Sequence, residues 1–202
     1  MVRVMIAFMK KAIFLPLILI LLSSCFIAVR VPTSTTIHTL IIENPTDAPM
    51  TVTSTSFTRT SKVTIPGRGN KEVEVRGAYG DDLILNTTGK YYSGRKQMAV
   101  EVTDGTLRCE PIPDRAWVKI VNYTGYTIED ITVSGSSVSY DKDGNEYRYN
   151  RLYDRTEAYF PVYGSDCGRR KDIEYRRNGY TRYYTGVTMP IAGKTLEFPV
   201  TK

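Results

Sequence analysis

The chain has 202 residues, with 27 basic and 21 acidic side chains and a formal net charge of +6. Arg3, Lys10 and Lys11 supply three of the positive charges, and from Cys25 onward 24 basic residues are interleaved with 21 acidic ones. A nucleic-acid-binding protein gathers its positive charge on one face, so this distribution excludes nucleic acid as an expected partner.

The first element in chain order is an apolar run from Ala12 to Leu22 that follows Lys10-Lys11. Its eleven residues are too few for a membrane-spanning helix, which needs about 20 apolar residues. A basic segment, an apolar stretch of this length and small residues at its end are the three regions of a secretory signal peptide. We therefore predict a signal peptide over residues 1–24.

The end of this run carries a short motif, Leu22-Ser23-Ser24-Cys25, which resembles the lipobox of bacterial lipoproteins. The resemblance covers the first 25 residues and implies cleavage between Ser24 and Cys25, with a covalent lipid on the Cys25 thiol. Two or three acyl chains anchor a protein stably, because each buried methylene contributes about 0.8 kcal/mol. The alternative is an ordinary buried cysteine after an uncleaved signal anchor. No cofactor other than the lipid is expected.

The residue after Cys25 is Phe26 rather than aspartate. By resemblance to the sorting rule of enterobacterial lipoproteins, this favours the outer membrane over the inner one, with the protein facing the periplasm. Residues 25–37 contain a polar stretch with Pro32, Arg30 to Thr36, which is typical of a flexible tether.

From about Thr33 the apolar residues recur with period two, which predicts an all-β protein. Seven segments rich in β-branched residues are predicted strands: 40–42, 63–65, 72–75, 83–85, 98–102, 117–121 and 128–133. Turn sequences such as Pro66 to Asn70, Asp141 to Asn145 and Asn178-Gly179 separate the predicted strands. This spacing is typical of antiparallel β-sandwiches.

A break at residues 109–114, with Pro111 and Pro113, indicates a linker between two sandwiches over 38–110 and 114–202. A weak repeat supports the division: residues 40–46 and 118–124 each end a strand in Asn-x-Thr. Val63 to Pro66 then aligns with Val187 to Pro190, which would give the second copy a 46-residue, tyrosine-rich insertion. Chance similarity of short strands is the alternative. If real, the repeat resembles the tandem immunoglobulin-like sandwiches of envelope lipoproteins.

The two remaining cysteines, Cys109 and Cys167, form an even pair in a protein expected to be exported to an oxidising compartment. A disulfide between them is one prediction, and two buried thiols are the other. A metal site is not expected, because two distant cysteines and the single histidine, His38, lack the close spacing of zinc ligands.

An enzyme is not expected either. His38 stands at the start of the first predicted strand, beside the tether, which is a poor place for a catalytic base. Acidic pairs such as Asp81-Asp82 and Glu129-Asp130 would point to opposite faces of a strand, so solvated surface is the better interpretation.

Tyrosine is the most unusual compositional feature, because twelve of the fifteen tyrosines lie between Tyr123 and Tyr184 and many alternate with arginine. Both side chains are enriched at contact surfaces, and tyrosine rings also stack on sugars. The alternative is that cross-strand ring pairs only hold the hairpins together. The candidate binding residues are Tyr147, Tyr149, Tyr153, Tyr175, Tyr180 and Tyr183.

Two classes of function follow. The first is a membrane-anchored envelope lipoprotein that acts as a non-catalytic structural or protein-interaction module. The second is a lipoprotein that binds carbohydrate or peptidoglycan through the exposed tyrosines. Coplanar exposed rings would favour the sugar, and a broad apolar patch would favour a protein partner.

Overall fold

The computed structural model describes residues 35–147 and 150–202, and Thr35–Lys202 forms one compact unit. These residues fold into fourteen β-strands and one 3-10 turn, η1 (Gly164–Asp166). In this part of the chain no helix is long and apolar enough to cross a membrane. The predicted all-β sandwich fold is confirmed, and each of the seven predicted strand segments lies in a strand, except that Val102 follows the end of β6.

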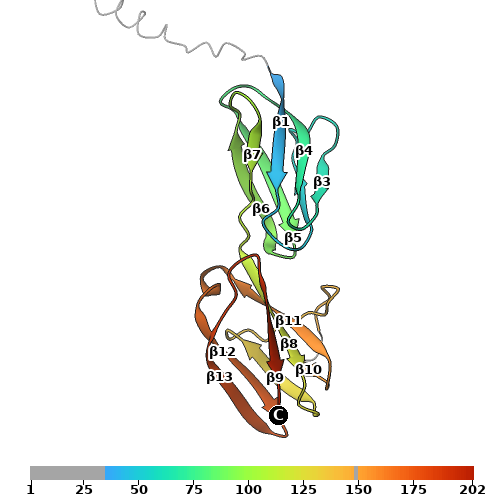
Figure 1. The fold of residues 1–202 in the computed structure, drawn as a ribbon, viewed down its shortest axis with the longest axis vertical. Coiled ribbons are helices and arrows are strands. Elements are labelled where there is room, and N and C mark those ends of the chain that lie inside the picture. The colour runs from blue at the N-terminus through green and yellow to red at the C-terminus, as the bar shows by residue number, and fades with distance from the viewer. Residues whose placement is uncertain (1–34, 148–149) are drawn as a thin grey trace, which may run out of the picture. The chain divides into compact units, whose positions relative to one another are not determined.

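The first sandwich has two sheets, of strand order β4-β1-β7 and β3-β2-β5-β6 (Figure 1). Its strands are β1 (Thr36–Glu43), β2 (Met50–Thr53), β3 (Lys62–Ile65), β4 (Asn70–Gly77), β5 (Asp82–Gly89), β6 (Tyr92–Glu101) and β7 (Leu107–Cys109). Alternate residues face the core, so Val63 and Ile65 are buried while Lys62 and Thr64 are exposed. Period-two burial therefore explains why the sequence pattern located these strands.

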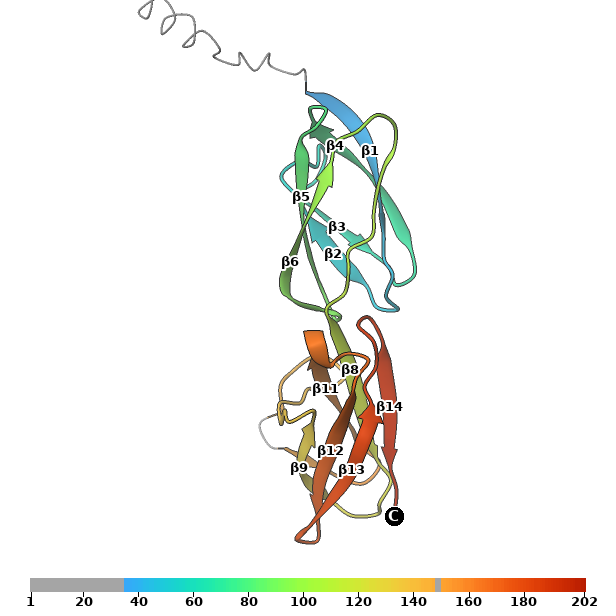
Figure 2. The same ribbon diagram turned by 90° about the vertical axis from the view of Figure 1, so that its left-hand side faces the viewer.

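The second sandwich has sheets of order β11-β8-β14 and β10-β9-β12-β13. Its strands are β8 (Arg115–Asn122), β9 (Ile128–Val133), β10 (Arg151–Leu152), β11 (Glu157–Tyr163), β12 (Arg170–Arg177), β13 (Tyr180–Thr188) and β14 (Thr195–Val200). Figure 2 shows β12 and β13 as a long hairpin in this sandwich. Ile120, Phe160 and Ile173 are fully buried between the two sheets.

The two sandwiches have the same topology. Adding seven to each strand number in the two sheets of the first sandwich gives the strand orders of the second. The strands β1 and β8 are therefore equivalent, as are β5 and β12. The internal repeat suggested by the two Asn-x-Thr segments therefore extends over seven strands in each copy.

One pairing in each sandwich differs from the antiparallel pattern that was expected. β1 pairs in parallel with β7, and β8 pairs in parallel with β14, whereas every other paired strand is antiparallel. Side chains alternate between faces in both kinds of ladder, so the sequence period carries no information about strand direction. The first and last strands of each copy are thus joined side by side.

The predicted boundary between residues 110 and 114 lies between β7 and β8. Residues on both sides of it belong to the same compact unit, so the division into two separate domains stays a prediction. β1 begins at Thr36, two residues before the predicted start of the first sandwich. The predicted signal peptide and most of the tether, residues 1–34, lie outside the described residues.

Candidate functional site

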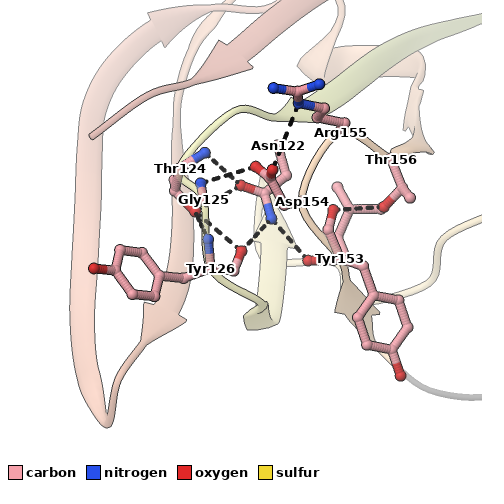
Figure 3. A network of polar contacts seen from close by, with 9 residues as sticks. Asn122, Thr124, Gly125, Tyr126, Tyr153, Asp154, Arg155 and Thr156 are labelled. Carbon is pink, nitrogen blue, oxygen red and sulfur yellow. Dashed lines mark hydrogen bonds and ion pairs between the residues drawn. The ribbon is translucent and has the colours of Figure 1, made fainter.

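A buried polar network closes the corner where β8 leads into β9 (Figure 3). The Oδ1 atom of Asn122 accepts hydrogen bonds from the backbone N–H of Thr124 at 3.0 Å and from its hydroxyl at 2.8 Å. The Nδ2 atom of Asn122 donates to the carbonyl oxygens of Tyr126, at 2.7 Å, and Leu152, at 2.9 Å. Asn122 and Thr124 are fully buried, so the network takes the place of water for these groups.

The first sandwich contains the same network around Asn44. Its Oδ1 atom accepts from the N–H and hydroxyl of Thr46 at 3.0 and 2.8 Å, and its Nδ2 atom donates to the carbonyl oxygens of Ala48 at 2.8 Å and Ile65 at 3.3 Å. The shared Asn-x-Thr sequence therefore forms the same hydrogen-bonded corner in both sandwiches, so chance similarity does not explain it.

This equivalence corrects the second half of the sequence alignment. Ile65 corresponds to Leu152, because the carbonyl oxygen of each accepts a hydrogen bond from the Nδ2 atom of the corner asparagine, whereas Val187 lies in β13. The insertion is correspondingly small: 17 residues, 134–150, connect β9 to β10, where 8 residues, 54–61, connect β2 to β3. The Thr/Val resemblance near Val187 misled the alignment, because many strands share those residues.

The two corners differ in how they are sealed. In the first, a Cβ atom on Gly67 would lie 2.2 Å from the backbone oxygen of Asp47, so only glycine fits. In the second, the equivalent residue is Asp154, whose carboxylate accepts a hydrogen bond from the N–H of Gly125 at 2.8 Å. The first corner therefore places Asp47 opposite Gly67, and the second places Gly125 opposite Asp154. A side-chain hydrogen bond stabilises the second corner.

The second corner also carries tyrosines that the first lacks. The positions of Pro45, Ala48 and Pro66 in the first corner are those of Tyr123, Tyr126 and Tyr153 in the second. All three tyrosines are exposed, and Figure 3 shows the Tyr126 and Tyr153 rings directed away from the polar network. The same rigid scaffold therefore presents aromatic rings in one copy only.

The β12–β13 turn adds a fourth ring to this end of the second sandwich. Asn178 and Gly179 have φ angles of 51° and 79°, the left-handed values of a tight hairpin, as their sequence predicted. Tyr180 follows them and is 71% exposed, and the Arg177 guanidinium lies 5.7 Å from the centre of the Tyr126 ring. We call Tyr123, Tyr126, Tyr153, Arg177 and Tyr180 the tyrosine end.

The equivalent end of the first sandwich is covered by the second. The β5–β6 turn corresponds to the β12–β13 turn, and there the Tyr91 hydroxyl is hydrogen-bonded to the Thr195 hydroxyl at 2.9 Å. Trp117 donates its indole N–H to the Lys90 carbonyl oxygen at 2.8 Å. Burial of its ring raises the pKa of Tyr91 to about 12. This end of the fold is thus already used as a contact surface within the molecule.

Of the six tyrosines predicted to bind, the structure exposes Tyr153, Tyr180 and Tyr183, and leaves Tyr147 partly exposed with its hydroxyl donating to the Glu157 carbonyl oxygen. Tyr149 lies outside the described residues. The prediction was wrong for Tyr175, which is 3% exposed and stacks on Tyr184 with ring centres 6.0 Å apart.

The exposed rings also do not share one strand face. In this part of the chain the structure describes one short strand, β10, Arg151–Leu152, which does not contain Tyr147 or Tyr153. Tyr180 and Tyr183 are three residues apart in β13, so they point to opposite faces of the sheet. Coplanar stacking of the predicted tyrosines, the arrangement that would favour a sugar platform, is not what the described residues form.

Of the two alternatives for the remaining cysteines, the structure has the pair of thiols: Cys109 and Cys167 are free. Cys109 packs against the core of the first sandwich and Cys167 against that of the second, so each is held by a different set of apolar side chains. Burial, with Glu43 nearby, raises the pKa of Cys109 to about 12. Ser24 and Cys25, the predicted cleavage and lipidation residues, lie outside the described residues.

Comparison with protein-family models and with curated proteins finds no match. Six chains of solved structures match this one. One of them is a crystal structure of a candidate cell adhesion protein from Bacteroides fragilis, with 11% sequence identity, 80% of this chain and 92% of that chain covered, and a TM-score of 0.23. A likeness of this degree carries no argument about function, which therefore has to be argued from the molecule itself.

Sequence reasoning missed Tyr123 and Tyr126 as surface residues. The signal was present, because Tyr123 lies inside the repeated Asn-x-Thr segment where the first copy has Pro45. A comparison of the two copies position by position, rather than a count of tyrosines, would have found them. The repeat had to be aligned correctly first.

Proposed function

We propose that the protein is a lipid-anchored lipoprotein of the bacterial cell envelope that acts as a non-catalytic structural and protein-interaction module, with the tyrosine end as its contact surface. One observation carries this proposal. The end of the first sandwich is buried against the second through Tyr91, Lys90 and Trp117, while the equivalent end of the second is open and bears Tyr123, Tyr126, Tyr153 and Tyr180.

The chemistry of the tyrosine end fits a protein partner. Tyrosine and arginine are the residues enriched at protein interfaces, because they bury a large area at a small cost in conformational entropy. The hydrogen-bonded corner beneath them holds the backbone of Tyr126 and Leu152 in place, so little further ordering is needed on binding. Arg177 and Lys202, which approaches Gly125, favour a partner with acidic groups.

The lipid anchor is proposed from the lipobox at Cys25, the polar tether behind it and the outer-membrane preference given by Phe26. A polar tether of about a dozen residues would join the lipid to the folded part of the chain. The membrane is thus one partner, and an envelope protein is the other.

The anchor is tested by the intact mass of the protein from its native membrane fraction. A chain that starts at Cys25 and carries acyl mass supports the proposal, and Cys25→Ala should leave an unacylated chain that no longer fractionates with membranes. An uncleaved or unmodified wild-type chain would overturn the lipoprotein assignment.

The contact surface is tested by a variant in which Tyr123, Tyr126 and Tyr153 are all changed to serine. We expect cross-linking of the anchored protein in intact envelopes to join it to a defined protein, and the variant to lose that product. The matched control is Tyr79→Ser, which removes an equally exposed ring from the first sandwich. Loss of the product in both variants, or in neither, would count against the tyrosine end.

Carbohydrate binding stays as the second candidate function, but a different place in the fold supports it. The predicted tyrosines do not form a common platform, whereas a separate cavity lined by Trp117, Tyr140 and Tyr159 has aromatic walls.

A further inference from the structure

A cavity of about 380 Å³ lies beside the start of β8, within the range of volumes found for small-molecule sites. Its lining comes from four places in the chain: Arg115 and Trp117 in β8, Tyr159 in β11, the turn from Tyr140 to Gly144, and Lys90 in the β5–β6 turn. None of these residues belongs to the tyrosine end. The cavity is therefore a second, independent candidate site.

Three aromatic rings form its walls. The Trp117 and Tyr140 rings meet edge to face, with centres 5.6 Å apart and planes at 88°. Tyr140 and Tyr159 are joined by two backbone hydrogen bonds of 2.9 Å, which hold the 139–144 turn against β11. Rings held from the backbone in this way offer fixed surfaces against which a ligand can stack.

Three cations line the cavity, Lys90, Arg115 and Lys142, and the first two lie over aromatic rings. The Lys90 ammonium is 5.2 Å from the centre of the Tyr159 ring, and the Arg115 guanidinium is 5.5 Å from that of Trp117. Within residues 35–147 and 150–202 neither forms an ion pair, and the buried Nε atom of Arg115 has no hydrogen-bond partner. A partly buried guanidinium without a counter-charge is costly, and an anion bound in the cavity would offset that cost.

The turn at the cavity rim contains two acidic residues, Asp141 and Asp143, which have different roles. The Asp141 carboxylate accepts hydrogen bonds from the backbone N–H groups of Asp143 and Asn145, and from the Asn145 amide, which lower its pKa. Asp141 therefore serves the turn. Asp143 also lines the cavity, and its carboxylate makes no hydrogen bond within the described part of the chain. It is available as an acceptor for ligand hydroxyl groups.

From this combination we infer that the cavity binds a saccharide that carries a carboxylate. The partly exposed ring of Tyr140 or Tyr159 would stack on the apolar face of the sugar, while the buried Trp117 ring forms part of the cavity wall. Arg115 and Lys90 would bind the carboxylate, and Asp143 would accept from hydroxyl groups. A neutral sugar would leave the two cations without a counter-charge. A simple inorganic anion would leave the aromatic walls unused.

The test uses the fluorescence of Trp117, which is the only tryptophan in the chain. The full-length protein is titrated with glucuronic acid, N-acetylmuramic acid and N-acetylneuraminic acid, and in parallel with N-acetylglucosamine and sodium acetate. We expect at least one acidic sugar to shift the emission in a saturable way, and the neutral sugar and acetate to bind at least tenfold more weakly. No saturable change with any acidic sugar would overturn the inference, as would equal binding of N-acetylglucosamine.

Two variants test the assigned groups. Lys90→Gln, at an exposed turn residue, and Arg115→Gln should each weaken binding of the acidic sugar about tenfold or more. Arg182→Gln removes an exposed cation from β13, away from the cavity lining, and should leave the affinity unchanged. Unchanged affinity in Lys90→Gln, with its thermal midpoint retained, would overturn the assignment even if Arg115→Gln failed to fold. The variant with Tyr123, Tyr126 and Tyr153 changed to serine should bind the acidic sugar as the wild type does. The proposal of a contact surface and the proposal of a saccharide cavity can therefore fail independently.

Discussion

Asn122 shows how much a single residue contributes to this fold. Its amide is fully buried and links three segments of chain that meet at one corner. The Asn122→Ala change would leave the carbonyl oxygens of Tyr126 and Leu152 and the Thr124 N–H without this partner. We expect the free energy of unfolding to fall by about 3 kcal/mol, measured by urea denaturation.

The equivalent Asn44→Ala change should cost a similar amount, because the same bonds are lost in the first corner. Asn70→Ala, at an exposed position in β4, is the control and should change stability by less than about 0.5 kcal/mol. A small effect of Asn122→Ala would mean that water can replace the amide, and would contradict the structural role assigned to the corner.

Buried thiol and phenol groups predict loss of stability in alkali. The pKa of Cys109 is raised from 9.0 to about 12, and those of Tyr91 and Tyr92 from 10.0 to about 12, chiefly by burial. The folded protein therefore holds protons that the unfolded chain releases above about pH 9, so the stabilisation is complete below that pH and is lost as the pH rises towards 12. We expect the urea midpoint to fall steadily from pH 9 to 11.

Cys109→Val should flatten the first part of this fall, because Cys109 and Cys167 are thiols with an unfolded pKa near 9, and burial raises the pKa of both in the folded protein. The wild-type thiol should also resist alkylation at pH 8 until the protein is unfolded, since the thiolate is the reactive form. Rapid alkylation of the native protein would show that the burial of Cys109 is not maintained in solution.

At the scale of elements, the turn between β3 and β4 depends on Gly67. An added Cβ atom there meets the backbone oxygen of Asp47 at 2.2 Å, and backbone cannot move aside as a flexible side chain can. We expect Gly67→Ala to lower the free energy of unfolding by about 3 kcal/mol or more, measured by thermal denaturation.

Gly94→Ala is the matched control. Gly94 has a φ angle of 67° but no atom within 4 Å of the added Cβ, so only the cost of a left-handed conformation, about 1 kcal/mol, applies. Equal effects of the two substitutions would show that the loop of Asp47 adapts.

The elements also show where change is tolerated in this fold. The connection between β9 and β10 is about twice as long as that between β2 and β3, yet the strand order of the two copies is the same. The longer connection supplies Tyr140 and Asp143 to the cavity wall. Loop length has little effect on strand pairing, because the entropy of loop closure grows slowly with length.

At the scale of the whole molecule, contacts between the two sandwiches predict cooperative unfolding. Trp117, in β8, packs with the core cluster of the first sandwich and hydrogen-bonds to Lys90. We expect a single calorimetric transition for the wild type. Trp117→Ala should produce two transitions, with the melting temperature of at least one sandwich lowered.

The control for this experiment is Ile120→Val, which lies in the same strand but faces only the core of the second sandwich. It should lower stability by about 1 kcal/mol while keeping one transition. Two well-separated transitions in the wild type would show that the sandwiches unfold independently, as the predicted boundary at residues 110–114 implies.

The parts of the structure predicted from the sequence are those that local patterns encode. Seven strand segments, the Asn178-Gly179 turn and the all-β class follow from side-chain alternation and from residues that tolerate positive φ. Seven other strands, long ones such as β13 included, were not among the predicted segments; β13 is mostly exposed, so its apolar residues show no alternation. The choice between a disulfide and two thiols stayed open because counting cysteines does not show which core each one packs against.

The sequence by itself determined the strand-forming segments and the repeated Asn-x-Thr corners, because each depends on residues close together in the chain. Only the tertiary structure decided that Leu152, not Met189, completes the second corner, that Tyr175 is buried and that Tyr123 is exposed. It also brought Lys90, Trp117 and Tyr159 to one cavity. These arrangements depend on how strands far apart in the chain pair, and that information is carried by packing rather than by local sequence.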